Sequence, residues 1–202
     1  MRLTYITKNL LIMNVLVYFG TLVFMGDNRL LLAVFYPTSD YFQPYQIVTY
    51  MFMHGTITHL FFNMFGLIIF GPAIEQAWGP RKFLFYYFFT AIGALLLQWF
   101  VQFIEMKTGG AITINNPMLG ASGAIFGLLA AFGMQYPNVT LRLIFPPIPM
   151  KAKYFVIGYA AIELFMGLGN FQSGVAHFAH LGGAIFGVLL ILYWRNTGER
   201  LY

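Results

Sequence analysis

Four polar side chains in otherwise apolar stretches are the residues best suited to covalent chemistry: Ser122, His180, His59 and Asn63. A serine hydroxyl is a weak nucleophile until a neighbouring base removes its proton, and histidine is the usual base. His59 and Asn63 are four residues apart, so a helix would present them on one face. The set predicts nucleophilic acyl transfer, with Ser122 as the nucleophile and His180 as the general base.

Acyl transfer also needs hydrogen-bond donors that stabilise the negative oxygen of the intermediate. Ser122 falls near the expected start of a helix, where backbone N–H groups lack helical partners and the helix dipole favours negative charge. The side chains of His59 and Asn63 are further candidate donors for this oxyanion hole. Gly120 and Gly123 flank the serine and allow other backbones to approach it closely.

A carboxylate often completes a serine–histidine pair by orienting the imidazole. We find none in a suitable place among the six acidic residues, which are Asp27, Asp40, Glu75, Glu105, Glu163 and Glu199. Glu163 falls inside an apolar stretch, near its expected middle, where it has no evident role. We therefore expect a dyad without a carboxylate, in which Phe126, one helical turn after Ser122, stacks against His180.

Each of these residues also has a structural interpretation. A serine between glycines is common where helices pack, and a buried histidine or asparagine can simply bond a neighbouring backbone. His54 is expected to anchor a loop or support the oxyanion hole rather than to react. His177 and His180 are three residues apart, as in some metal sites, but no cysteine or carboxylate accompanies them in the sequence. We therefore expect no metal and no cofactor.

The composition indicates a membrane protein. Hydrophobic residues make up 59% of the chain and charged residues 8%, against about 25% charged in ordinary soluble domains. Membrane lipid is therefore the expected surrounding, and the net charge of +5 is not a sign of a nucleic-acid partner. The absence of cysteine excludes disulfides and thiolate chemistry.

A membrane-spanning helix needs roughly 20 mostly apolar residues. Six such stretches follow one another along the chain: 9–25, 57–75, 82–104, 119–136, 153–171 and 176–194. We expect an all-α membrane protein with six transmembrane helices in a single domain, residues 1–202, whose first span is retained. The aromatic connection 26–56 is expected to lie partly in the membrane, and the proline-rich connection 137–152 to form an ordered turn.

Lysine and arginine are distributed unevenly between the two sides of such a bundle. One side holds both termini and nine of the eleven bases, namely Arg2, Lys8, Arg81, Lys82, Arg142, Lys151, Lys153, Arg195 and Arg200; the other holds Arg29 and Lys107. Basic loops stay in the cytoplasm, so we expect an inner cell-membrane protein with both termini cytoplasmic. Ser122, His180 and His59 then lie at one shallow depth on the non-cytoplasmic side.

Small residues predict that the fourth and sixth spans approach each other closely. Gly123-x-x-x-Gly127 and Gly183-x-x-x-Gly187 have the spacing that lets helices pack tightly in membranes. Each motif begins at or just after a candidate catalytic residue. We therefore expect these glycines to bring the serine and the histidine within reach of each other.

Taken in order, the motifs resemble those of the rhomboid intramembrane serine proteases, in their compact six-span bacterial form. The matching segments cover nearly the whole chain and are His54-x4-His59-x3-Asn63, Glu75-Gln76-Ala77-Trp78-Gly79, Gly120-Ala121-Ser122-Gly123 and Ala179-His180-Leu181-Gly182-Gly183-x3-Gly187. The resemblance implies a dyad of Ser122 and His180, with His59, Asn63 and the Ser122 backbone N–H in the oxyanion hole. It also implies single-pass transmembrane protein substrates, cut near the non-cytoplasmic face without cofactor or metal.

Two positions depart from the family pattern. Pro44-Tyr45-Gln46 stands where many members have a Trp-Arg pair, and Phe126 stands where well-known members have tyrosine. Two other functions stay open: a proteolytically inactive rhomboid-like protein that binds transmembrane helices, and a transporter or membrane haem protein that uses histidine pairs. The presence of both Ser122 and His180 favours the protease, and a haem would leave the glycines around Ser122 unexplained.

Overall fold

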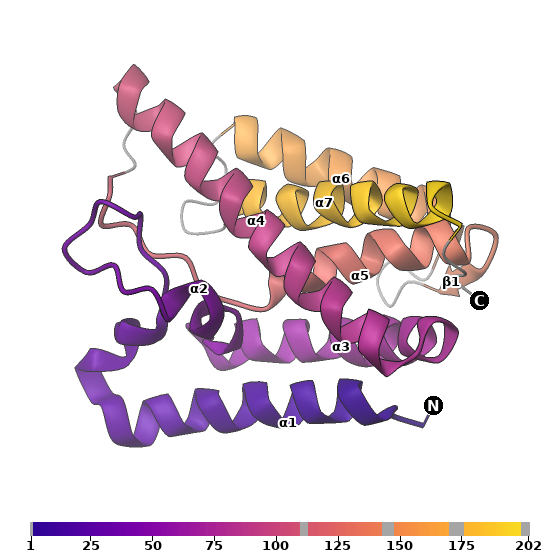
Figure 1. The fold of residues 1–202 in the computed structure, drawn as a ribbon, viewed down its shortest axis with the longest axis horizontal. Coiled ribbons are helices and arrows are strands. Elements are labelled where there is room, and N and C mark those ends of the chain that lie inside the picture. Colours follow the sequence, from indigo (N-terminus) through magenta and orange to yellow (C-terminus); the bar gives the residue numbers. More distant parts are fainter. Residues whose placement is uncertain (1, 110–112, 143–147, 170–175, 199–202) are drawn as a thin grey trace.

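The computed structural model describes residues 2–109, 113–142, 148–169 and 176–198, without the side chains of 27–29. The chain is mostly helical, and six main helices form one bundle (Figure 1): α1 (Tyr5–Gly20), α3 (Ile57–Trp78), α4 (Pro80–Thr108), α5 (Ser122–Gln135), α6 (Ala152–Leu168) and α7 (His177–Asn196). The shorter elements are η1 (Thr21–Met25), η2 (Gly26–Leu32), α2 (Gln46–Thr49), η3 (Tyr50–Phe52), β1 (Thr140–Arg142) and β2 (Pro149–Lys151).

Each predicted span contains a helix, but the helices differ in length. Among the described residues, four segments are long and apolar enough to cross a membrane: α1 with its π-helical continuation η1, then α3, α4 and α7. Helix α5 has 14 residues, which is about 21 Å at 1.5 Å per residue and shorter than the roughly 30 Å hydrocarbon layer. Helix α6 has 17 residues. The sequence therefore placed the helices correctly but gave α5 too many residues.

The connection between α5 and α6, which we expected to form an ordered turn, contains two short strands. Strands β1 and β2 pair antiparallel there, with Thr140 opposite Lys151 and Arg142 opposite Pro149. Pro149 is the first residue of β2, a position where a missing backbone N–H is tolerated. The prolines that rule out a helix in this segment are thus compatible with a short hairpin.

Helix α5 is the centre of the bundle. It packs against α3, α4, α6 and α7, and every residue from Gly123 to Gly133 is buried. A helix that is apolar on all sides belongs inside a protein rather than at its surface. Its neighbours therefore cover this short helix, and its first residue, Ser122, begins inside the molecule.

Glycines allow α5 and α7 to touch at the level of the site. A methyl group on Gly183 would lie 2.7 Å from the carbonyl carbon of Gly123, so the two backbones are in direct contact and the predicted close approach is confirmed here. The second glycine of each motif behaves differently. Gly127 faces Thr90 of α4, and Gly187 faces Tyr86 and Thr90 of α4. One helical turn beyond the site, these glycines therefore allow α5 and α7 to pack closely against α4.

Glu75 joins the last turn of α3 to the first turn of α1. Its carboxylate accepts hydrogen bonds from the backbone N–H groups of Ile6 and Thr7, both at 2.8 Å, and from the hydroxyls of Thr4 and Thr7. A negative charge at a helix N-terminus is favourable because the unpaired N–H groups point toward it. This buried contact fixes α1 against α3.

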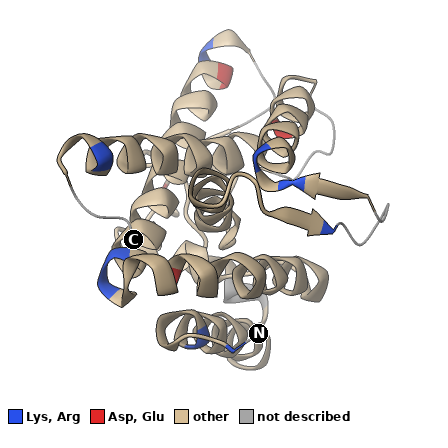
Figure 2. Cartoon of the chain, turned by 90° about the vertical axis from the view of Figure 1, so that its right-hand side faces the viewer, with Lys and Arg blue, Asp and Glu red and all other residues tan. Residues whose placement is uncertain are grey.

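Basic residues gather at one end of the bundle. Figure 2 shows the end that carries the N-terminus and the last turn of α7, which is the right-hand side of Figure 1. The first turn of α4, the start of α6 and the β1–β2 hairpin also lie at this end (Figure 1), and these segments contain Arg81, Lys82, Lys153, Arg142 and Lys151. Lys107 lies at the opposite end of α4, and Arg200 falls outside the described residues.

The long connection between α1 and α3 is stabilised by hydrogen bonds among its own residues. Gln46 is fully buried; its amide donates to the carbonyl oxygens of Leu31 and Tyr41 at 3.1 and 3.0 Å, and its oxygen accepts from the Gln43 N–H at 3.0 Å. Gln46 thus organises this connection. Its aromatic rings divide between the core and the surface, since Tyr50 is buried and Tyr41 is exposed.

Candidate active site

Ser122 is the first residue of α5, and the segment before it is fixed by backbone hydrogen bonds. Met118 and Val34 exchange two bonds of 2.8 and 2.9 Å, and the Gly120 N–H donates to the Tyr50 carbonyl at 2.9 Å. Gly120 has a φ of +117°, a conformation that favours glycine. The chain therefore turns sharply into α5 and leaves the first backbone N–H groups of the helix without helical partners.

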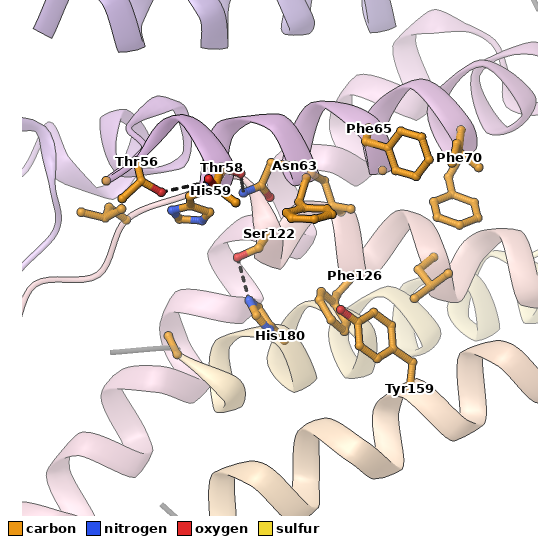
Figure 3. Close-up of a pocket in the computed structure, with 18 of the residues that line it drawn as sticks. Thr56, Thr58, His59, Asn63, Phe65, Phe70, Ser122, Phe126, Tyr159 and His180 are labelled. Atoms are coloured by element: carbon orange, nitrogen blue, oxygen red, sulfur yellow. Dashed lines mark hydrogen bonds between the residues drawn. The ribbon is translucent and has the colours of Figure 1, made fainter. Parts of the chain in front are cut away.

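His180 lies directly against Ser122 (Figure 3). The distance from His180 Nε2 to Ser122 Oγ is 2.8 Å, although the two residues come from different helices. The Phe126 ring is parallel to the imidazole, with ring centroids 4.3 Å apart and planes 6° apart. The predicted stacking contact is therefore present, and it restricts how the His180 ring can turn.

Glu163 also contacts His180, contrary to our expectation that no carboxylate lies near the base. Its Oε2 is 3.0 Å from His180 Nδ1 and 2.7 Å from His177 Nδ1. The expectation failed because it considered the position of Glu163 within its own helix and not the packing of α6 (Ala152–Leu168) against α7, which brings Glu163 to His180. The sequence did contain a signal for this contact. A glutamate in an apolar helix needs a partner, because buried charges are unfavourable unless they are paired. The next helix offers two histidines three residues apart.

The same three residues could in principle offer ligand atoms to a metal ion. Their three ligand atoms lie within 4.8 Å of one another. However, two nitrogen or oxygen ligands bound about 2.0–2.1 Å from a tetrahedral zinc are about 3.3 Å apart. The observed separations of 2.7 and 3.0 Å fit hydrogen bonds with a proton between the atoms.

His59 and Asn63 line the same pocket from α3 (Figure 3). The Thr56 side chain caps this helix by accepting from the His59 N–H at 3.1 Å. The His59 ring packs against the backbone of Gly120, where a methyl group would lie 2.8 Å from its Nε2. Asn63 donates one amide proton to the His59 carbonyl at 2.9 Å, which leaves its second N–H for another acceptor.

His54 is buried behind His59 rather than in the pocket lining. Its ring centroid is 5.0 Å from that of His59, and its Nδ1 is 3.3 Å from the Phe52 carbonyl oxygen. Burial and the neighbouring His59 lower the pKa of His54 to about 4, so it is neutral at physiological pH. This arrangement agrees with a supporting role and not with a reacting one.

The site opens into a large cavity of about 1140 Å³. Ser122 and His180 line one part of it, and the remainder lies between α3 and α6, where Phe65 and Tyr159 belong to its wall (Figure 3). The wall is mostly apolar, and Figure 3 shows His59 and Asn63 on the side of the cavity near Ser122, with Phe65 and Phe70 farther away. Such a cavity can hold an apolar peptide segment with one carbonyl near the nucleophile.

Comparisons with known proteins agree with this geometry. A family model described as the Rhomboid domain matches residues 41–197. The chain is similar to the rhomboid protease AarA of Providencia stuartii, with 31% identity over 97% of this chain and 74% of that protein. The chain belongs to the rhomboid family. It is also similar to Rhomboid-like protease 3 of Toxoplasma gondii, at 28% identity over 85% of this chain and 60% of that protein.

Other rhomboid relatives are longer than this chain. The mitochondrial presenilin-associated rhomboid-like protein of Bos taurus is 32% identical over 72% of this chain, but the match spans only 38% of that protein. Family membership and the apolar helices establish a multi-pass membrane protein. At the level of the family, they support an intramembrane protease function.

Proposed function

We propose that this rhomboid is an intramembrane serine endopeptidase in which Ser122 is the nucleophile and His180 the general base. The observation that carries the proposal is the 2.8 Å contact between Ser122 Oγ and His180 Nε2 at the wall of an apolar cavity. Both ring nitrogens of His180 have protein partners, Ser122 and Glu163, which argues against a haem ligand.

The reaction follows from the positions of these groups. Ser122 Oγ attacks the carbonyl carbon of the scissile bond while its proton moves to His180 Nε2, and the carbonyl oxygen becomes an oxyanion. The Ser122 N–H at the start of α5, together with the His59 and Asn63 side chains, would donate hydrogen bonds to that oxygen. Collapse of the intermediate breaks the C–N bond, and the amine leaves with the proton from Nε2. Water then releases the acyl group by the same steps.

We further propose that the chain crosses the membrane six times, with both termini in the cytoplasm. The concentration of basic residues at the end shown in Figure 2 supports this orientation, because basic segments stay on the cytoplasmic side. Ser122 and His180 then lie toward the opposite, non-cytoplasmic side, where water can reach them. The short α5 is consistent with a six-span bundle because its neighbours shield it from lipid.

The proposed substrates are proteins with a single transmembrane segment. The apolar cavity between α3 and α6 suits such a segment once it is unwound near Ser122. The test is cleavage of a panel of single-span proteins reconstituted with the purified enzyme. We expect cleavage by the wild type and by Ser39→Ala, whose serine lies in the connection before α3, and none by Ser122→Ala. Binding without cleavage by the wild type would instead identify an inactive helix-binding protein.

A further inference from the structure

Glu163 and His177 have no part in the reaction above, yet both are buried beside it. Glu163 is 6% exposed and His177 is 7% exposed, in a bundle whose helices are otherwise mostly apolar. Burying such groups is unfavourable unless they are paired. They are paired through one atom, because Glu163 Oε2 contacts Nδ1 of both His177 and His180.

The hydrogen bonds determine which nitrogen of His180 carries the proton. An ionised carboxylate can only accept hydrogen bonds, so Nδ1 of His180 and Nδ1 of His177 must both donate to Oε2. Neutral His180 then has a free lone pair on Nε2, which points to the Ser122 hydroxyl 2.8 Å away. In the other tautomer the proton would be on Nε2 of His180, so an N–H would face the Ser122 hydroxyl. The lone pair of Nδ1 would then face a lone pair of the Glu163 carboxylate, which is repulsive.

We propose that Glu163 is a positioning residue that holds His180 in the tautomer and orientation needed to accept the proton of Ser122, and that His177 holds Glu163. The inference rests on the proposed function. When the Ser122 proton reaches Nε2, the carboxylate stays ionised and faces the imidazolium. Glu163 takes up no proton itself.

The two histidines form a double donor on α7. His177 is the first residue of the helix and His180 follows one turn later, so both Nδ1 atoms reach the same oxygen from one side. Phe126 covers the face of the His180 ring and Ser122 lies at its Nε2. Carboxylate, phenyl ring and serine together restrict the imidazole more than a Ser122–His180 dyad alone would.

The kinetic test compares Glu163→Gln with Glu105→Gln, the same change at the far end of α4. Loss of a charge-assisted hydrogen bond should lower kcat for a single-span substrate roughly 10- to 100-fold. The KM should stay close to that of the wild type, because Glu163 acts on the base and not on the substrate. Glu105→Gln should leave both unchanged, and His177→Ala should reduce kcat less than Glu163→Gln does. A folded Glu163→Gln enzyme with wild-type kcat would overturn the proposal.

A spectroscopic test on the wild type needs no substitution at Glu163 or His177. The ring nitrogens of ¹⁵N-histidine-labelled wild type report the tautomer of each neutral imidazole, and the His180→Ala spectrum identifies the signals of His180. We expect His180 to be protonated at Nδ1, and protonation at Nε2 would contradict the proposal. Failure of the proposed function is distinguishable, because the wild type would then not cleave substrates at all.

Discussion

Gly183→Ala should move Ser122 away from His180, the proposed nucleophile and base, without changing either side chain. The new methyl group would lie 2.7 Å from the Gly123 carbonyl carbon and 3.1 Å from its Cα, where ordinary contacts are 3.4–4 Å. The Gly123 backbone cannot move aside as a flexible side chain could, so α5 and α7 must move apart by about 1 Å or tilt. Such a shift would take the Ser122–His180 distance from 2.8 Å to almost 4 Å, beyond a hydrogen bond.

The expected losses follow from that displacement. A misplacement of about 1 Å can reduce catalysis roughly 100-fold, while overpacking destabilises a core by about 1–3 kcal/mol. The assay is the rate at which a fluorophosphonate probe labels the enzyme in detergent, measured well below the melting temperature. Gly158→Ala is the matched control, since nothing lies within 4 Å of the methyl group it adds. A wild-type labelling rate for a folded Gly183→Ala enzyme would refute the reasoning.

Three further predictions concern metal, pH and stability. Chelation with EDTA should leave the labelling rate unchanged, because hydrogen bonds already occupy the His177–Glu163–His180 cluster; loss of activity that zinc restores would contradict this. Burial and the adjacent His59 lower the pKa of His54 from 6.5 to about 4. The unfolded chain therefore binds a proton at His54 more readily than the folded protein does. The free energy of unfolding should fall by about 3 kcal/mol between pH 6.5 and pH 4. The melting temperature of His54→Gln should fall less over this range, and an equal fall would count against the assignment. Glu75→Gln should destabilise the protein by about 1.5–3 kcal/mol through weaker bonds to α1, with the labelling rate at low temperature unchanged, because Glu75 is at the opposite end of α3 from His59.

The contact between Ser122 and His180 was predictable because each residue carries a local signal. Ser122 and His180 are polar residues in apolar, glycine-containing segments, and the alternation of the helices puts them at one end of the bundle. Phe126 follows Ser122 by one helical turn, so its position on the same face was fixed once α5 was recognised. These are properties of single helices and of their order, which the sequence records directly.

Contacts between helices were harder to predict. Whether Glu163 reaches His180 depends on where α6 ends and how far it is shifted along α7, and no pattern within either helix sets that shift. The packing of Gly127 and Gly187 was also not predictable from their spacing. Both contact α4, and they do not contact each other. The hairpin of β1 and β2 was missed because three-residue strands show no periodicity and prolines suggested only a turn.

The most direct measurement is to locate the adduct that the wild-type enzyme forms with a fluorophosphonate. Peptide mass spectrometry can distinguish the three serines of the chain, Ser39, Ser122 and Ser173. We expect a single adduct on Ser122 that is absent from His180→Ala, because only His180 Nε2 lies within hydrogen-bond distance of that hydroxyl among the described residues. An adduct on another residue, or undiminished labelling of Ser122 in His180→Ala, would contradict the assignment of nucleophile and base.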